Sequence, residues 1–183
     1  MVRSIRTTIF ILLATIASVV LTFPLQSRNV SQLEQDIEDF SGDLIGLDYA
    51  VSSYGSTRFR PKAIDISGKF DLTLNGLQQC VNDINRIRGT RITTADAQIV
   101  LKLVEAFKPT ILHTLATVRS KKGVFKKLHM IPFILGQVKD LCRGVTALME
   151  GLVSVVPSQF QGEATVVQQK FGVAFLETFL AYH

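Results

Sequence analysis

The spacing of the apolar residues is the feature of this chain that most constrains its fold. Residues 31–54 show it most clearly, because their apolar positions recur at alternating intervals of four and three: Leu33, Ile37, Phe40, Leu44, Leu47, Val51 and Tyr54. This spacing keeps the side chains on one stripe of an α-helix. Comparable stripes predict four further helices, over residues 62–88, 93–122, 132–156 and 158–182. No segment sustains the period of two that is typical of a strand.

The fold class that follows is all-α: an antiparallel bundle of five helices joined by short loops. Local signals support the helix starts. Ser31 opens a capping box before the first helix, and Thr93 or Thr94 is a natural N-cap for the third. Pro132 suits the first turn of the fourth helix, where its missing N–H costs nothing. The basic stretch 123–129 is predicted to be a connection without a helix of its own.

The N-terminus has the order of a secretory signal peptide, which we place at residues 1–22 with an uncertain cleavage point. Arg3 and Arg6 precede an uncharged apolar run over residues 7–21. The alternative is an uncleaved anchor, but a run of about 15 residues is short for a hydrocarbon core of roughly 30 Å. We therefore expect residues 23–183 to form a single domain without an integral membrane span. The mature protein is expected to be secreted, either free in the extracellular space or associated with a cell wall.

Two further features fit an extracellular protein. Asn29 begins the single N-glycosylation sequon of the chain and is a candidate glycosylation site. The mature chain also holds an even number of cysteines, Cys80 and Cys142. They are candidates for one disulfide between two helices, or for two buried thiols that fill the core.

The charge of the chain gives no general case for nucleic-acid binding. Removing the signal peptide leaves 18 basic residues against 15 acidic ones. Basic residues concentrate in the run 119–127, where they can complement the C-terminal end of a helix dipole or bind an anionic partner. We expect no nucleic-acid partner.

The sequence also lacks the usual signs of catalysis. His113, His129 and His183 have no second histidine or cysteine at the spacing of zinc ligands. Neither a nucleophile elbow nor a phosphate-binding glycine loop is present. We therefore expect a protein that is not an enzyme and that has no metal site and no cofactor.

An apolar ligand site between the helices is the binding hypothesis that the sequence supports. The aromatic stripe of the last helix is expected to face apolar residues of the third and fourth helices, and such sites are common in bundles. The candidate lining residues are Phe107, Ile111, Leu115, Leu135, Val138, Phe171, Phe175 and Phe179. The same residues can also form a plain core, so the pattern leaves both interpretations open.

Two stretches carry a resemblance to a known family. The first is the Leu-Asp-x-Ala-Val-x-x-Tyr pattern that ends at Tyr54, and the second runs from Asp96-Ala97 to the mid-helix Pro109. Together with the Val156-Pro157 break, they resemble the fungal hydrophobic surface-binding protein A family, which includes cell-wall galactomannoproteins. The resemblance implies a secreted five-helix bundle. It also implies that some relatives hold fatty acids between helices and that others adsorb to hydrophobic solids.

Three functions remain at this point. The first is a secreted, non-enzymatic protein that binds a fatty acid or similar lipid between its helices. The second is a protein that adsorbs to a hydrophobic surface or cell wall and recruits secreted hydrolases. The third is a secreted effector. The first two need the same amphipathic helices, so the sequence does not separate them.

Overall fold

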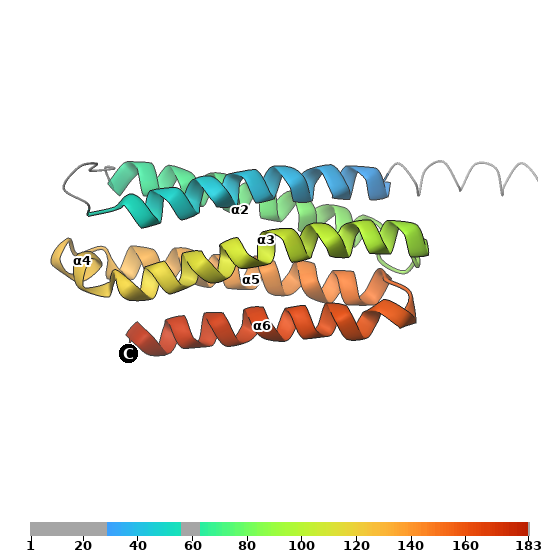
Figure 1. Cartoon of the computed structure of the whole chain (residues 1–183). Coiled ribbons are helices and arrows are strands. Elements are labelled where there is room, and N and C mark those ends of the chain that lie inside the picture. The colour runs from blue at the N-terminus through green and yellow to red at the C-terminus, as the bar shows by residue number, and fades with distance from the viewer. Residues whose placement is uncertain (1–28, 56–62, 183) are drawn as a thin grey trace, which may run out of the picture.

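The computed structural model describes residues 29–55 and 63–182, and these residues are all-helical, as predicted. The N-terminal helix covers residues 29–53 of this range. It is followed by α2 (Ala63–Arg86), α3 (Thr94–Ser120), α4 (Lys122–Lys127), α5 (Ile131–Val155) and α6 (Ser158–Tyr182) (Figure 1). No strand occurs within the described ranges. The predicted signal peptide lies outside them.

Two of the predicted boundaries are wrong. Residues 29 and 30 are already helical, so Ser31 lies inside the N-terminal helix and is not its N-cap. The stretch 123–129 is not a plain connection, because most of it belongs to α4, which brings the described helices to six. A helix of under two turns has too few residues to show a period. Phe125 is its one fully buried residue, and Val124 is partly buried against the core. By contrast, the hydroxyl of Thr93 accepts from the amide of Asp96 (3.2 Å), as an N-cap does.

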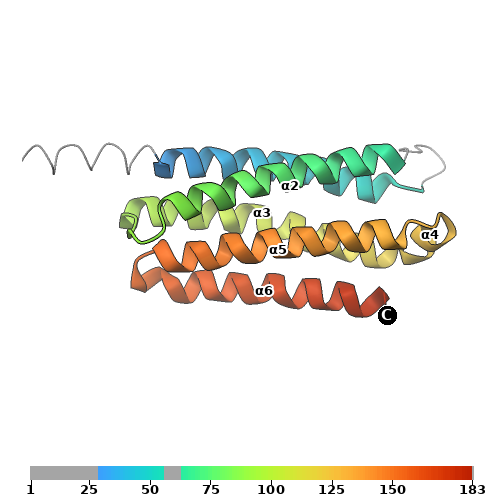
Figure 2. The same ribbon diagram turned by 180° about the vertical axis from the view of Figure 1, so that it is seen from behind.

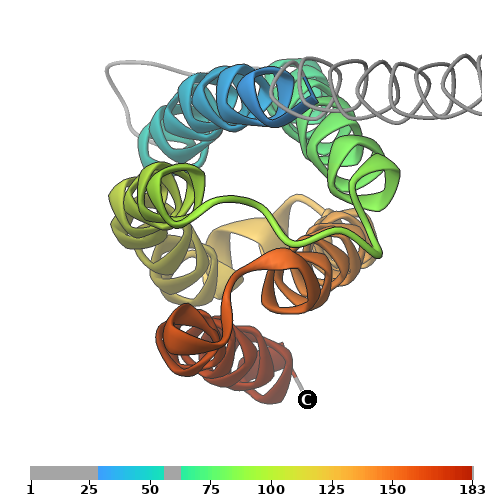
Figure 3. The same ribbon diagram turned by 90° about the vertical axis from the view of Figure 1, so that its right-hand side faces the viewer.

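The long helices lie side by side and alternate in direction along the chain (Figures 1 and 2). Seen from one end they form a ring (Figure 3). Within the ring α2 packs against α5, α5 against α6, and α6 against α3. The N-terminal helix completes it between α2 and α3: the Thr73 hydroxyl donates to the Asp43 carbonyl (3.3 Å), and the rings of Phe40 and Phe107 are 5.2 Å apart.

The interior of the ring is a continuous apolar core. Every residue of the N-terminal stripe, from Leu33 to Tyr54, is buried. The same holds for the predicted stripe of α5, from Ile134 to Val155. In α2, Leu74 and Val81 are only partly buried, because they line a groove on the outside of the bundle.

Two glycines of α5 face α2 and allow the two helices to approach closely. Gly144 and Gly151 lie seven residues apart on α5, opposite Leu77 and Ile84, which are also seven apart on α2. A Cβ atom at Gly151 would lie 2.7 Å from Ile84 Cγ2, and one at Gly144 would lie 2.5 Å from Leu77 Cδ2. The missing side chains therefore set the distance between the two helices.

Two lysines of the basic run complete helix C-termini. Lys121 Nζ donates to the carbonyls of Ser52 and Tyr54, both at 2.5 Å, at the end of the N-terminal helix. Lys122 Nζ donates to the Ala181 carbonyl (2.7 Å) at the end of α6. A cation is favourable at this end of a helix dipole, so these two residues fit the helix-end interpretation of the run. Burial lowers the pKa of Lys121.

Candidate functional site

The candidate lining residues divide into two groups in the structure. Six are fully buried in the core of the ring: Phe107, Ile111, Leu115, Val138, Phe171 and Phe175. Phe179 is partly buried and packs against the core, and Leu135 is also only partly buried. Leu135 is one position from the stripe that runs through Ile134 and Val138, which explains its position at the edge.

Three phenylalanines from three helices form the centre of this interior. The Phe107 ring meets Phe40 edge to face, with centroids 5.2 Å apart, and stacks on Phe171 at 6.0 Å. Aromatic rings favour both geometries beyond the area that they bury. The predicted lining omits Phe40, although the position of Phe40 on the N-terminal apolar stripe indicates that its side chain is buried.

Both ends of the interior are covered. At one end Phe125 of α4 is buried and stacks on Tyr54, with centroids 5.7 Å apart. At the other end the loop between α2 and α3 runs across the ring (Figure 3). This loop buries Ile92, whose amide donates to the Val155 carbonyl at 3.0 Å. The interior is therefore a packed apolar core that the helices enclose laterally and that α4 and the loop cover at its ends.

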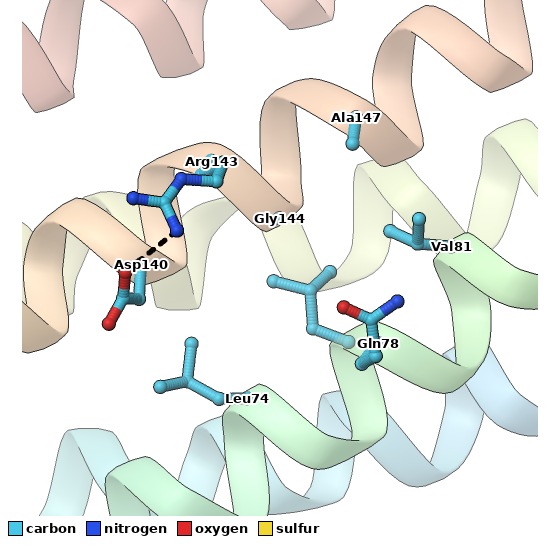
Figure 4. A pocket seen from close by; sticks show the side chains of 8 residues that line it. Leu74, Gln78, Val81, Asp140, Arg143, Gly144 and Ala147 are labelled. Atoms are coloured by element: carbon cyan, nitrogen blue, oxygen red, sulfur yellow. Dashed lines mark ion pairs between the residues drawn. The ribbon is translucent and has the colours of Figure 1, made fainter.

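Two grooves on the outside of the bundle are more open. One lies between α2 and α5, has a volume of about 360 Å³ and is drawn in Figure 4. Leu74 and Val81 form one wall, and the ion pair between Asp140 and Arg143 (3.3 Å) lies on the other. The second groove, of about 470 Å³, lies between α3 and α6. Both combine apolar walls with charged rims.

A polar pocket of about 350 Å³ lies between the N-terminal helix and α2. Asp36 accepts from Gln32 Nε2 (2.8 Å), and Asp83 pairs with Arg86 (2.5 Å). Burial and the neighbouring carboxyl of Asp36 raise the pKa of Asp83 to about 6. Its Oδ2 atom is buried without a hydrogen-bond donor. The arrangement favours the protonated form of the Asp83 carboxyl. No group of three or more metal-ligating side chains occurs among the described residues.

The pair formed by His113 and Asp48 connects two helices and has a structural role. His113 Nδ1 lies 2.7 Å from Asp48 Oδ1, and the Thr114 hydroxyl donates to the same oxygen at 2.9 Å. Asp48 belongs to the N-terminal helix and the other two residues to α3. The cluster therefore joins two neighbouring helices of the ring.

The remaining candidates are placed as follows. Cys80 and Cys142 are free thiols, Cys80 buried on α2 and Cys142 partly buried on α5. Burial raises the pKa of the Cys80 thiol to about 12, so it is not a reactive thiolate. Asn29 is exposed on the N-terminal helix, and its glycosylation stays a prediction. None of the described helices combines the length and apolarity needed to cross a bilayer.

A family comparison identifies the relationship of the chain. The model for hydrophobic surface binding protein A matches residues 30–154, which is more than half of the sequence. The chain belongs to this family. The resemblance that its helix motifs indicated is thereby confirmed. Comparison with curated proteins finds no significant sequence match.

Solved structures share the fold at low sequence identity. Ligand binding domain 1 of the Penicillium marneffei MP1 protein, complexed with arachidonic acids, matches with a TM-score of 0.75 and 14% identity, over 85% of this chain and 99% of that one. AFMP4P in complex with palmitic acid matches with a TM-score of 0.76 and 15% identity, over 84% and 99%. Ligand binding domain 2 of MP1, also with arachidonic acids, matches with a TM-score of 0.73 and 12% identity, over 83% and 92%.

Proposed function

We propose that the protein is a secreted five-helix bundle, closed at one end by α4, that binds a fatty acid or similar lipid inside the ring. The observation that carries this proposal is the enclosed apolar interior around Phe40, Phe107 and Phe171. Membership of the hydrophobic surface binding protein A family supports it. So do the arachidonic and palmitic acids in structures of the same fold.

The energetics allow a ligand to open a core that is packed without it. A palmitoyl chain has about fourteen methylenes, and at about 0.8 kcal/mol each their burial contributes roughly 11 kcal/mol. Shifting side chains to make room costs about 1–3 kcal/mol for a local overpacking. Association entropy costs a further 4–15 kcal/mol, depending on the reference. The hydrophobic gain is therefore several times larger than the cost of the rearrangement, and it also offsets the association entropy when that cost lies in the lower half of its range.

Native mass spectrometry and calorimetry on delipidated protein test this function. We expect palmitate or arachidonate to form a complex that survives transfer to the gas phase. Absence of any complex, with either acid and without any co-purified lipid, would contradict the proposal.

A matched pair of variants locates the site. Ala164 is fully buried on α6, whereas Ala147 lines the outer groove between α2 and α5. Ala164→Leu takes up interior volume and should weaken fatty-acid binding roughly tenfold or more, by the 1–3 kcal/mol of a local overpacking. Ala147→Leu should leave it unchanged. If Ala147→Leu weakened binding and Ala164→Leu did not, the lipid would bind in the outer groove and the proposed interior site would be wrong.

Adsorption to a hydrophobic surface is a second candidate. The N-terminal helix exposes Ile45 and Tyr49 one turn apart, at 58% and 65% of their surface. Binding to polystyrene beads should then persist in high salt, because salt screens exposed charges but not apolar contacts. Replacing both residues by serine should reduce the bound amount, and adsorption that salt abolishes would refute this function.

A further inference from the structure

Helix α6 has a second apolar face on its exposed side, and two of its residues, Val166 and Val173, also line the groove between α3 and α6. Val166, Val173, Leu176 and Leu180 are exposed over 50%, 56%, 57% and 63% of their surfaces. Successive helix residues turn by about 100°, so Leu180, nine positions after the buried Phe171, lies on the opposite side of the helix. The position of α6 agrees with this, because it lies at the edge of the molecule and packs against α3 and α5 on one side only (Figures 1 and 3).

The outward residues have the spacing of a helix-pairing seam. Their intervals are seven, three and four, which is the a and d pattern of a coiled coil. Such a pattern fits the side chains of another helix, which insert as knobs between them.

Opposite charges flank the same seam on the side that faces α3. Lys170 and Glu177 line the groove between α3 and α6, and Glu177 also lies 3.2 Å from Arg119. They are seven residues apart and therefore lie on one edge of the outward face. An antiparallel second α6 would meet this edge with its own copy of the same two residues.

We propose that this face of α6 binds a second copy of the protein, as an antiparallel two-fold dimer centred between Val173 and Leu176. The two-fold axis sets Val173 against Leu176 of the partner subunit, and this contact occurs twice. It also sets Lys170 against Glu177 of the partner subunit, and this contact occurs twice. A two-fold interface requires such self-complementarity.

Charge complementarity selects this arrangement over others. A parallel pairing would put this edge of the two helices on opposite sides of the seam, so Lys170 and Glu177 would not meet their copies on the partner subunit. In the antiparallel pairing both contacts join opposite charges. The seam residues supply the apolar contact area, and the two ion pairs fix orientation and register.

Sedimentation equilibrium of the full mature chain, over a concentration series into the high micromolar range, tests the dimer. We expect a monomer–dimer equilibrium for the wild type. Val173→Glu places a carboxylate against Leu176 of the partner subunit at both contacts and should leave only monomer. Leu72→Glu, at a comparably exposed apolar position on α2 (49%), is the matched control and should not change the equilibrium. Circular dichroism melts establish that each variant is folded.

A charge exchange then tests the register. Lys170→Glu and Glu177→Lys should each weaken self-association roughly tenfold or more, because each variant opposes like charges at both contacts. An equimolar mixture of the two variants should recover dimerisation, since both contacts of the mixed dimer join opposite charges. A wild type that stays monomeric, a dimer that survives Val173→Glu, or a mixture that associates no better than its components would overturn the proposal.

Discussion

Replacing Gly151 by alanine tests the close packing of α5 on α2. The added Cβ would lie 2.7 Å from Ile84 Cγ2 and 3.0 Å from Ile84 Cγ1. Ile84 is β-branched and fully buried, so it has little freedom to move away. Gly136 lies on the same helix, and no atom lies within 4 Å of the position that a Cβ would take there, which makes Gly136→Ala the matched control.

The two substitutions are expected to have opposite signs. Alanine is favoured over glycine within a helix by about 1 kcal/mol, so Gly136→Ala should stabilise the protein by up to about that amount. Gly151→Ala gains the same propensity but adds an overpacking cost of about 1–3 kcal/mol. It should therefore range from nearly neutral to about 2 kcal/mol destabilising, with a difference of roughly 1–3 kcal/mol between the two variants.

Urea denaturation followed by circular dichroism measures this difference. With equal m-values, the midpoints report the change in the free energy of unfolding. A Gly151→Ala protein that is as stable as Gly136→Ala would refute the close approach of α2 and α5.

Three further predictions concern stability. Phe107→Ala should lower the free energy of unfolding by about 3–5 kcal/mol, measured by urea denaturation, because it removes the ring that packs against Phe40 and Phe171 and leaves a cavity between them. Thr93→Ala should cost about 1 kcal/mol in the same assay through loss of the N-cap of α3. The third concerns pH. Burial raises the pKa of Asp83 from 3.8 to about 6, so between these values the folded protein binds a proton that the unfolded chain releases. Stability should therefore fall as pH rises from about 4 to 6, by on the order of 2–3 kcal/mol, and Asp83→Asn should remove this fall in denaturation curves across that range.

The long helices could be predicted because each of them carries an extended apolar stripe. The N-terminal stripe from Leu33 to Tyr54 and the α5 stripe from Ile134 to Val155 are buried throughout. Thr93 also caps α3 as its sequence context indicated. The stripes and the N-cap depend on residues within a few helical turns of one another, so the spacing of residues in the sequence is enough to predict them.

Features that depend on how helices meet could not be predicted in the same way. A helix as short as α4 shows no apolar period. The sequence around Gly144 and Gly151 also gives no indication of which α2 side chains these glycines contact. Leu135 lies one position from a buried stripe, so a small rotation of α5 decides its burial. Helix α6 is apolar on two faces, and periodicity alone revealed only the face that contains Phe171.

Tryptophan fluorescence offers the most direct test of lipid binding inside the ring, because the chain contains no tryptophan. Phe175→Trp places a single fluorophore in the interior, where Phe175 is 2% exposed. Tyr49→Trp places one on the outer surface, at a position 65% exposed, as the control. A fatty acid brominated along its chain quenches only a tryptophan that it contacts. We predict saturable quenching at position 175 and none at position 49; quenching at position 49 alone, or at neither position, would contradict a lipid site inside the ring.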